Sequence, residues 1–259
     1  DVRCVPTLQK DIARLKFEQR SVQQEFSHHP VDNAFHGLQF AASEYGIHGA
    51  VPPEVLHWYK KGMYYYPIKG LFDALGETHK HHFDAVLARV ACLSKAKSDR
   101  SIPDIKFTKG YCGMTSDKIK GNEMTGLVLG CCLAMHTPEG HQALSKAMSP
   151  KEIKGWKLLF ERLLIFEAWL AQEEFTEHQL GKESQEKIRV IMRLFKLVVN
   201  RKKGNGLNIT KYHQCLHILQ YIRRFGCPSN FDSNPCESNH KENQKRTARN
   251  TQRRGASLP

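Results

Sequence analysis

Apolar residues recur every three or four positions along most of this chain, and this spacing restricts it to a fold built from helices. Two clear examples cover residues 156–172 and 185–200, each with one apolar face. Those faces consist of Leu159, Leu163, Phe166 and Leu170 in the first segment and Ile188, Ile191, Leu194, Phe195 and Val198 in the second. Such spacing is typical of amphipathic helices. No stretch shows the pattern of a β-hairpin or a βαβ unit, so we expect a mainly α protein.

Local signals predict where several helices begin and end. The pair Pro52-Pro53 favours a helix start, because proline fits the first turn but not the interior, and Gly76 favours a break. The run Ser149-Pro150-Lys151-Glu152 has the cap, proline and acid order of a helix N-terminus. We expect helices over residues 7–26, 54–75, 79–96, 124–135, 156–172, 185–200 and 209–225, and a last one that starts near Cys236.

From these segments we expect four parts along the chain. Residues 1–32 form a polar helical lead-in, and residues 33–203 form a helical region. Residues 204–251 form a C-terminal pair of helices. Residues 252–259 form a disordered basic tail, because they carry charge, glycine and serine and have little to bury.

The net charge of +13 in 259 residues is concentrated toward the end of the chain. From Arg201 onward the sequence has twelve Lys and Arg residues against three acidic residues. A localised positive field attracts phosphate polymers or anionic surfaces. Nucleic acid is therefore a candidate partner, and an ordinary solvated surface is the alternative.

The sequence points to an intracellular protein with no membrane partner. Its first residues have no apolar core of the secretory type. The longest apolar run, Leu127 to Met135, is far shorter than the ~20 residues of a membrane span. The eight cysteines are scattered and several lie within apolar helical pattern, which is typical of reduced thiols rather than a disulfide framework.

Two Glu-x-x-His patterns, Glu54 to His57 and Glu237 to His240, are the first candidate metal ligands. Residues three apart on a helix share a face, so one ion could bind both side chains of a pair. Two such pairs with two further glutamates would match the di-metal carboxylate bundles. The candidates for those further glutamates are Glu161 and Glu167. The basic composition and irregular helix spacing disfavour this alternative. The more common explanation of a Glu-x-x-His pattern is that it occurs by chance on a helix.

His213 and His217 lie four residues apart, so they share one face of their expected helix. The zinc-protease pattern requires a glutamate directly after the first histidine. Gln214 occupies that position here, which excludes that class of enzyme. Ordinary core or surface histidines are the more frequent interpretation of such a pair.

A ridge of charge is expected on the last helix, where Glu237 is followed by cations at steps of four. These are Lys241, Lys245, Arg249 and Arg253, with Arg246 and Arg254 beside them. On an exposed helix the first Glu–Lys pair would contribute only a few tenths of a kcal/mol. The functional interpretation is that the cations bind a phosphate backbone without reading its sequence, while the carboxylate holds a metal at the bond to be cut.

Together these motifs resemble a known family, the CACTA-like transposases and especially their Plavaka-type relatives. The segment Pro52–Met63 resembles their Pro-Asp-Leu-Leu-His…Lys-Gly motif, and Phe107–Gly110 resembles the Phe-x-x-Gly that follows. Leu207–His217, Arg224–Pro228 and Glu237–Lys241 resemble their ending, Lys-x-His…His…Phe-Gly…Glu-x-x-His-Lys. The order and spacing agree over roughly residues 33 to 254.

The resemblance implies an RNase H-like DDE nuclease that cuts and joins DNA, in which three acids hold two Mg²⁺ or Mn²⁺ ions. In this family a large helical insertion separates the second acid from the last glutamate. By motif match Glu237 is that last catalytic acid and metal ligand. Glu54 and His57 occupy a signature thought to shape the active site. His213, His217 and His240 then become supports for the helices.

The resemblance also implies DNA as partner, self-association in a transposition complex, and the nucleus as location if the source is a eukaryote. This chain departs from the family at Glu54, where the signature has aspartate. The first two catalytic acids and their strands are expected before residue 1, so we expect the chain to be the helical insertion and closing helix of an incomplete core. On its own it should not cut DNA. A domesticated, non-catalytic helical module that binds nucleic acid or protein is the alternative.

Overall fold

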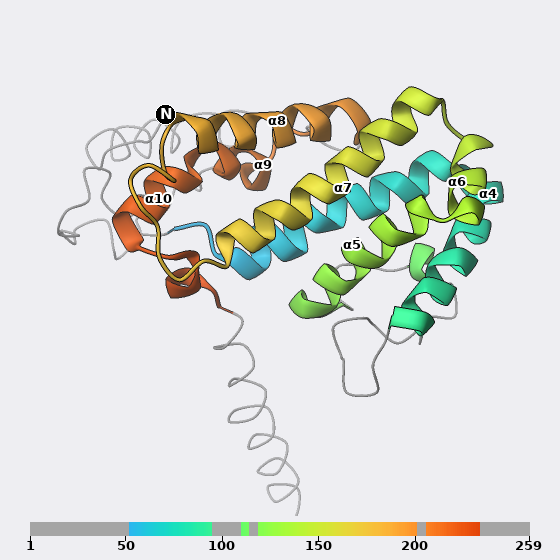
Figure 1. Cartoon of the computed structure of the whole chain (residues 1–259), viewed down its shortest axis with the longest axis horizontal. Coiled ribbons are helices and arrows are strands. Elements are labelled where there is room, and N and C mark those ends of the chain that lie inside the picture. The colour runs from blue at the N-terminus through green and yellow to red at the C-terminus, as the bar shows by residue number, and fades with distance from the viewer. Residues whose placement is uncertain (1–51, 95–109, 114–118, 201–205, 234–259) are drawn as a thin grey trace, which may run out of the picture. The chain divides into compact units, whose positions relative to one another are not determined.

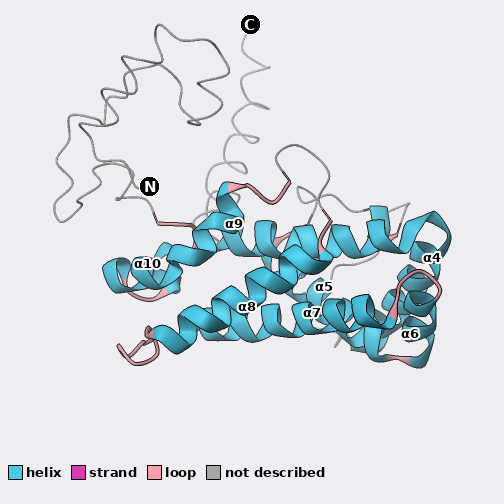
Figure 2. Ribbon diagram, turned by 90° about the horizontal axis from the view of Figure 1, so that it is seen from above, coloured by secondary structure: helices cyan, strands magenta, loops and turns pink. Residues whose placement is uncertain are grey.

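The computed structural model describes residues 52–94, 110–113, 119–200 and 206–233, and all regular structure within these ranges is helical (Figures 1 and 2). The helices belong to one compact unit that begins at Pro53. The expectation of a mainly α protein is confirmed. None of the described helices combines the length and apolar character needed to cross a membrane. Within the described ranges, the six cysteines form no disulfide with one another.

The described residues form a series of helices that begins at Leu56. In chain order they are η1 (Leu56–Tyr64, a π-helix), α4 (Tyr65–Ser94), η2 (Tyr111–Gly113), α5 (Gly121–His136), α6 (Pro138–Ser145), α7 (Pro150–Leu170), α8 (Lys182–Val198), α9 (Thr210–Gln214), η3 (Cys215–His217), α10 (Ile218–Phe225) and η4 (Pro228–Phe231). The elements η2, η3 and η4 are 3₁₀ helices.

The caps explain why α7 begins where the sequence predicted. The Ser149 hydroxyl accepts the backbone N–H of Glu152, and the Glu152 carboxylate accepts the backbone N–H of Ser149. This reciprocal pair satisfies two N–H groups that a helix start leaves without partners. Gly76 also behaves as expected, because its φ of 66° interrupts α4 in a region that glycine adopts readily.

Helix α7 is the centre of the bundle and lies between α5 and α8 (Figure 1). Its apolar face, expected from the spacing, is buried: Leu159, Phe160 and Leu163 are inaccessible to solvent and Trp156 nearly so. Each such side chain contributes roughly 1.5–3 kcal/mol when fully buried. Helix α4 packs against α5 and α6, and the π-helix η1 packs against α4, α5 and α9.

The structure differs from the expected helices in three places. The helix expected from residue 54 begins with nine residues of π-helix, and the helix expected over 209–225 is divided by the 3₁₀ turn η3. Helix α6 was not expected, because it is short and buries only Gly140, Ala143 and Leu144. The helices expected over residues 7–26 and from Cys236, and the tail over 252–259, lie outside the described residues.

Candidate functional site

The structure describes four of the residues that the sequence motifs single out, namely Glu54, His57, His213 and His217. The other expected site residues lie outside the described residues: Glu237, His240, Lys241, Lys245, Arg246, Arg249, Arg253 and Arg254. Glu54 and His57 form the signature pair, and His213 and His217 form the histidine pair.

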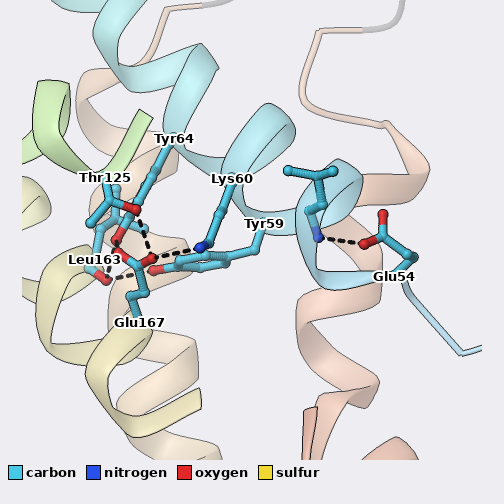
Figure 3. Close-up of polar contacts among 8 residues, drawn as sticks. Glu54, Tyr59, Lys60, Tyr64, Thr125, Leu163 and Glu167 are labelled. Atoms are coloured by element: carbon cyan, nitrogen blue, oxygen red, sulfur yellow. Dashed lines mark hydrogen bonds and ion pairs between the residues drawn. The ribbon is translucent and has the colours of Figure 1, made fainter. Parts of the chain in front are cut away.

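Glu54 acts as the cap of the π-helix η1, and its carboxylate joins η1 to a distant part of the chain. Oε1 accepts the backbone N–H of Leu56 at 2.7 Å and that of Ser233 at 2.8 Å. Oε2 accepts the backbone N–H of His57 at 2.7 Å and lies 2.6 Å from Nδ1 of the same residue. Figure 3 shows the carboxylate turned toward the backbone at the start of η1. Both oxygens are thus occupied by donors of the protein itself.

These contacts set the charge state of Glu54. Burial raises its pKa, but the N–H donors of Ser233, His57 and Leu56 and the ring of His57 together outweigh burial and leave the pKa below its ordinary value. Hydrogen bonds to the charged form favour ionisation. Glu54 is therefore ionised at neutral pH, and its carboxylate is held by hydrogen-bond donors of the protein.

A second connection brings the Lys-x-His segment onto η1. The indole Nε1 of Trp58 donates to the backbone oxygen of Lys211 at 2.8 Å. The Lys211 side chain lies over Gly62, where a Cβ would come within 2.7 Å of Lys211 Cδ. Gly62 thus provides the space that this close approach needs. Burial lowers the pKa of Lys211, while the charge of Glu54 opposes that change.

These contacts bring together parts of the chain that are far apart in the sequence. They are the motif segment that starts at Glu54, the motif segment around Lys211, and Ser233, which lies between two further motifs. Ser233 precedes Glu237 by only four residues. Glu54 therefore contacts the chain close in sequence to the expected catalytic acid.

His213 and His217 contact each other, and His217 also contacts the following helix α10. Their Nε2 atoms are 3.0 Å apart and their ring centroids 4.8 Å apart. His217 Nδ1 lies 3.2 Å from Gln220 Oε1. Burial, followed by the neighbouring His217, lowers the pKa of His213. The pair is accessible from solvent, since His213 is exposed and His217 is half-buried.

A partly buried polar network around Glu167 was not anticipated from the sequence (Figure 3). Glu167 Oε2 accepts the Tyr64 hydroxyl at 2.5 Å, and Oε1 accepts the Thr125 hydroxyl at 2.7 Å. Lys60 Nζ lies 3.5 Å from Oε1. The Tyr59 hydroxyl donates to the backbone oxygen of Leu163 at 2.5 Å. The network ties η1 to α5 and α7.

The π-helix explains how both tyrosines reach this network. In an α-helix, residues five apart point about 140° away from each other. A π-helix closes its hydrogen bonds over five residues, so Tyr59 and Tyr64 lie on one face with ring centroids 4.8 Å apart. Burial raises the pKa of both hydroxyls, which keeps them as donors. In the sequence, the sign of this arrangement was the spacing of five residues between Tyr59 and Tyr64.

The described residues do not form the cluster that a di-metal carboxylate site or a Mg²⁺ site requires. Among residues 52–94, 110–113, 119–200 and 206–233, no three His, Cys, Asp or Glu side chains gather closely enough to hold a metal ion. Glu161 instead contacts His136, with Oε1 3.2 Å from Nε2. Glu167 has the protein donors described above, so these two glutamates have separate structural partners.

An apolar groove of about 440 Å³ between α7 and α8 was also missed by the sequence analysis. Ile165, Trp169 and Val190 line it, with charged side chains at its rim. Ile165 keeps 59% of its surface exposed. Ile165 lies on the solvent-exposed side of α7. In the sequence it could not be distinguished from the apolar residues that form the core.

No protein-family model matches this chain, and no curated protein or solved structure matches it either.

Proposed function

We propose that this chain is a DNA-binding part of a transposase and corresponds to the C-terminal region of the CACTA-like, Plavaka-type enzymes of transposable elements. The hydrogen bond between Glu54 and the Ser233 backbone carries the proposal. This bond joins the Glu54 signature to a residue 179 positions further along the chain, which lies between the Arg224–Pro228 and Glu237–Lys241 motifs. In a eukaryotic cell this activity belongs to the nucleus.

In this proposal Glu237 is the last acid of an RNase H-like core and would bind Mg²⁺ or Mn²⁺ together with two further carboxylates. The described residues do not supply those carboxylates, and no catalytic step is assigned to them. Glu54 takes a structural role, because its four N–H donors leave it poorly suited to hold a metal. It positions the loop that leads to Glu237.

DNA binding is assigned to the basic residues after Glu237 rather than to the cations of α8. Three of the α8 cations have local acidic partners: Lys187 Nζ lies 2.7 Å from Glu183, and Arg193 Nη1 lies 2.9 Å from Glu186. Arg189 is 3.6 Å from the same Glu186. The acidic side chains of α8 therefore cancel part of the positive field of these cations. The six cations between residues 241 and 254 have only Glu242 among them.

The test is the salt dependence of binding to a generic DNA duplex, measured by fluorescence anisotropy. Replacing the six cations with glutamine in the full chain should remove most of the affinity. Each lost phosphate contact lowers the slope of log K against log salt by about 0.9. The six positions are Lys241, Lys245, Arg246, Arg249, Arg253 and Arg254.

The matched control replaces the three paired cations of α8 with glutamine. Those positions are Lys187, Arg189 and Arg193. This variant should keep the wild-type salt slope to within one phosphate contact, because its cations are already paired. If the six-fold variant binds as the wild type does, or if the α8 variant loses more affinity than the six-fold variant, the assigned surface is wrong.

The proposal also predicts that the chain binds DNA without cutting it. Incubation of supercoiled plasmid with the chain and Mn²⁺ should leave the plasmid intact, since Glu237 has no assigned carboxylate partners here. The Glu237→Gln variant should give the same result. Cleavage that disappears in Glu237→Gln would show that the chain holds a complete active site, whereas absence of both cleavage and DNA binding would contradict the proposed function altogether.

A further inference from the structure

The histidine pair on α9 and η3 has a geometry that the proposed DNA-binding function does not use. The Nε2 atoms of His213 and His217 are 3.0 Å apart and face each other. The pair is accessible, and no carboxylate hydrogen-bonds to either ring among the contacts of the described residues. Two imidazole nitrogens four residues apart on one helical face can reach a single ion.

Gln220 fixes the tautomer of His217 that a metal requires. Its Oε1 is an acceptor and lies 3.2 Å from His217 Nδ1, so Nδ1 carries the proton. The Nε2 of His217 therefore keeps its lone pair toward His213. Such a hydrogen bond on the outer nitrogen is the usual way in which proteins orient a metal-binding histidine. His213 Nε2 donates to this lone pair in the metal-free protein.

We propose that His213 and His217 together bind one late first-row divalent metal ion, such as Zn²⁺, Ni²⁺ or Cu²⁺, through their two Nε2 atoms. An ion 2.0–2.1 Å from both nitrogens, the usual zinc–imidazole length, would subtend an angle of about 94° across the observed 3.0 Å separation. This lies close to the cis angle of octahedral and square-planar sites. Each ring would have to turn so that its Nε2 lone pair points at the ion instead of at the other ring.

The ligand types select the metal. Imidazole favours zinc, copper and nickel, whereas Mg²⁺ and Mn²⁺ favour carboxylate and water. The ion is therefore of a different class from the one proposed to bind Glu237. On binding, His213 takes the tautomer protonated at Nδ1, so no net proton is released by a ring that is already neutral.

The site is bidentate, so water would complete the coordination. Because His213 belongs to α9 and His217 ends η3, the ion would clamp the place where the expected continuous helix is divided. Ions that bind only the folded chain raise its stability by mass action. Metal binding should therefore raise the unfolding temperature of the chain.

The test is calorimetric titration of the chelator-treated full chain with nickel chloride at neutral pH. His213→Ala, His217→Ala and the double variant should each bind one ion fewer than the wild type, and all three should bind equally. This equality distinguishes a two-ligand site from two separate histidines. His178→Ala removes an exposed histidine elsewhere and should bind as the wild type does. Far-UV circular dichroism checks that every variant is folded.

A second measurement does not depend on the variants being folded. In the wild-type chain, one equivalent of Zn²⁺ should shift the ring NMR signals of two histidines together, including the one whose Nδ1–H is bonded to Gln220. The proposal is overturned if either single variant keeps the wild-type stoichiometry, if the double variant loses more than a single one, or if no pair of rings responds together.

Discussion

Glu54 and Glu167 both anchor the π-helix η1, but they do so with different kinds of donor. Glu54 accepts three backbone N–H groups, one of them from Ser233, and contacts the ring of His57. Glu167 accepts the side-chain hydroxyls of Tyr64 and Thr125 and lies near Lys60. The Glu54 side chain keeps 28% of its surface exposed and that of Glu167 keeps 18%, and Figure 3 shows the two carboxylates at separate places along η1.

The kind of donor determines which part of the fold each glutamate stabilises. Backbone donors hold a local chain path, so Glu54 fixes the start of η1 and the loop at Ser233. Side-chain donors from η1 and α5 hold whole helices together, so Glu167 contributes to the bundle. Loss of Glu167 should therefore lower global stability more than loss of Glu54, whose effect should be local.

The largest expected effect is that of Glu167→Ala. This change removes the close acceptor of the buried Tyr64 hydroxyl and leaves it with the Leu163 backbone oxygen, 3.4 Å away, and the neighbouring Tyr59 hydroxyl. Leaving a buried donor without a good acceptor costs roughly 1–3 kcal/mol, and we expect about 2 kcal/mol in the free energy of unfolding. Denaturation with urea at neutral pH measures it. The matched control is Glu161→Ala on the same helix.

The control separates the network from the loss of a charge on α7. Glu161 pairs with His136 at the surface, and such pairs contribute about 0–1 kcal/mol. If Glu161→Ala and Glu167→Ala destabilise the chain equally, the network around Glu167 has no special role and the comparison with Glu54 fails.

A smaller effect is expected from the pH dependence of Glu54. Its folded-state pKa lies below the ordinary value of 4.5, so its stabilisation is complete above that pH and is lost as pH falls through the folded-state pKa. Glu54→Gln should lower the free energy of unfolding by about 1 kcal/mol at pH 7. The difference from wild type should shrink at pH 3. A difference that stays constant or grows on acidification would contradict an ionised cap.

The helical architecture could be predicted because it rests on local signals. The apolar spacing of residues 156–172 and the cap at Ser149 specify α7 with little help from the rest of the chain. The break at Gly76 is also local, since few other residues adopt a φ of 66°. Such features depend on neighbours within one helical turn.

The partners of the charged residues could not be predicted in the same way. The spacing of Glu54 and His57 correctly predicted that the two side chains lie together. It could not predict that Ser233 donates its backbone N–H to Glu54. Glu167 was a candidate metal ligand by residue type alone, and its hydroxyl donors come from η1 and α5. The π-helix that aligns Tyr59 with Tyr64 depends on burial against α7, which is long-range in sequence.

The most direct test of Glu54 as a local tie is native-state hydrogen exchange in the Glu54→Ala variant. The account predicts faster exchange of the amides of Leu56, His57 and Ser233, whose acceptor is removed. The amides of α5 and α7 should exchange at wild-type rates after correction for about 1–2 kcal/mol of lost cap energy. Unchanged exchange at Ser233, or equal acceleration throughout α5 and α7, would contradict the account.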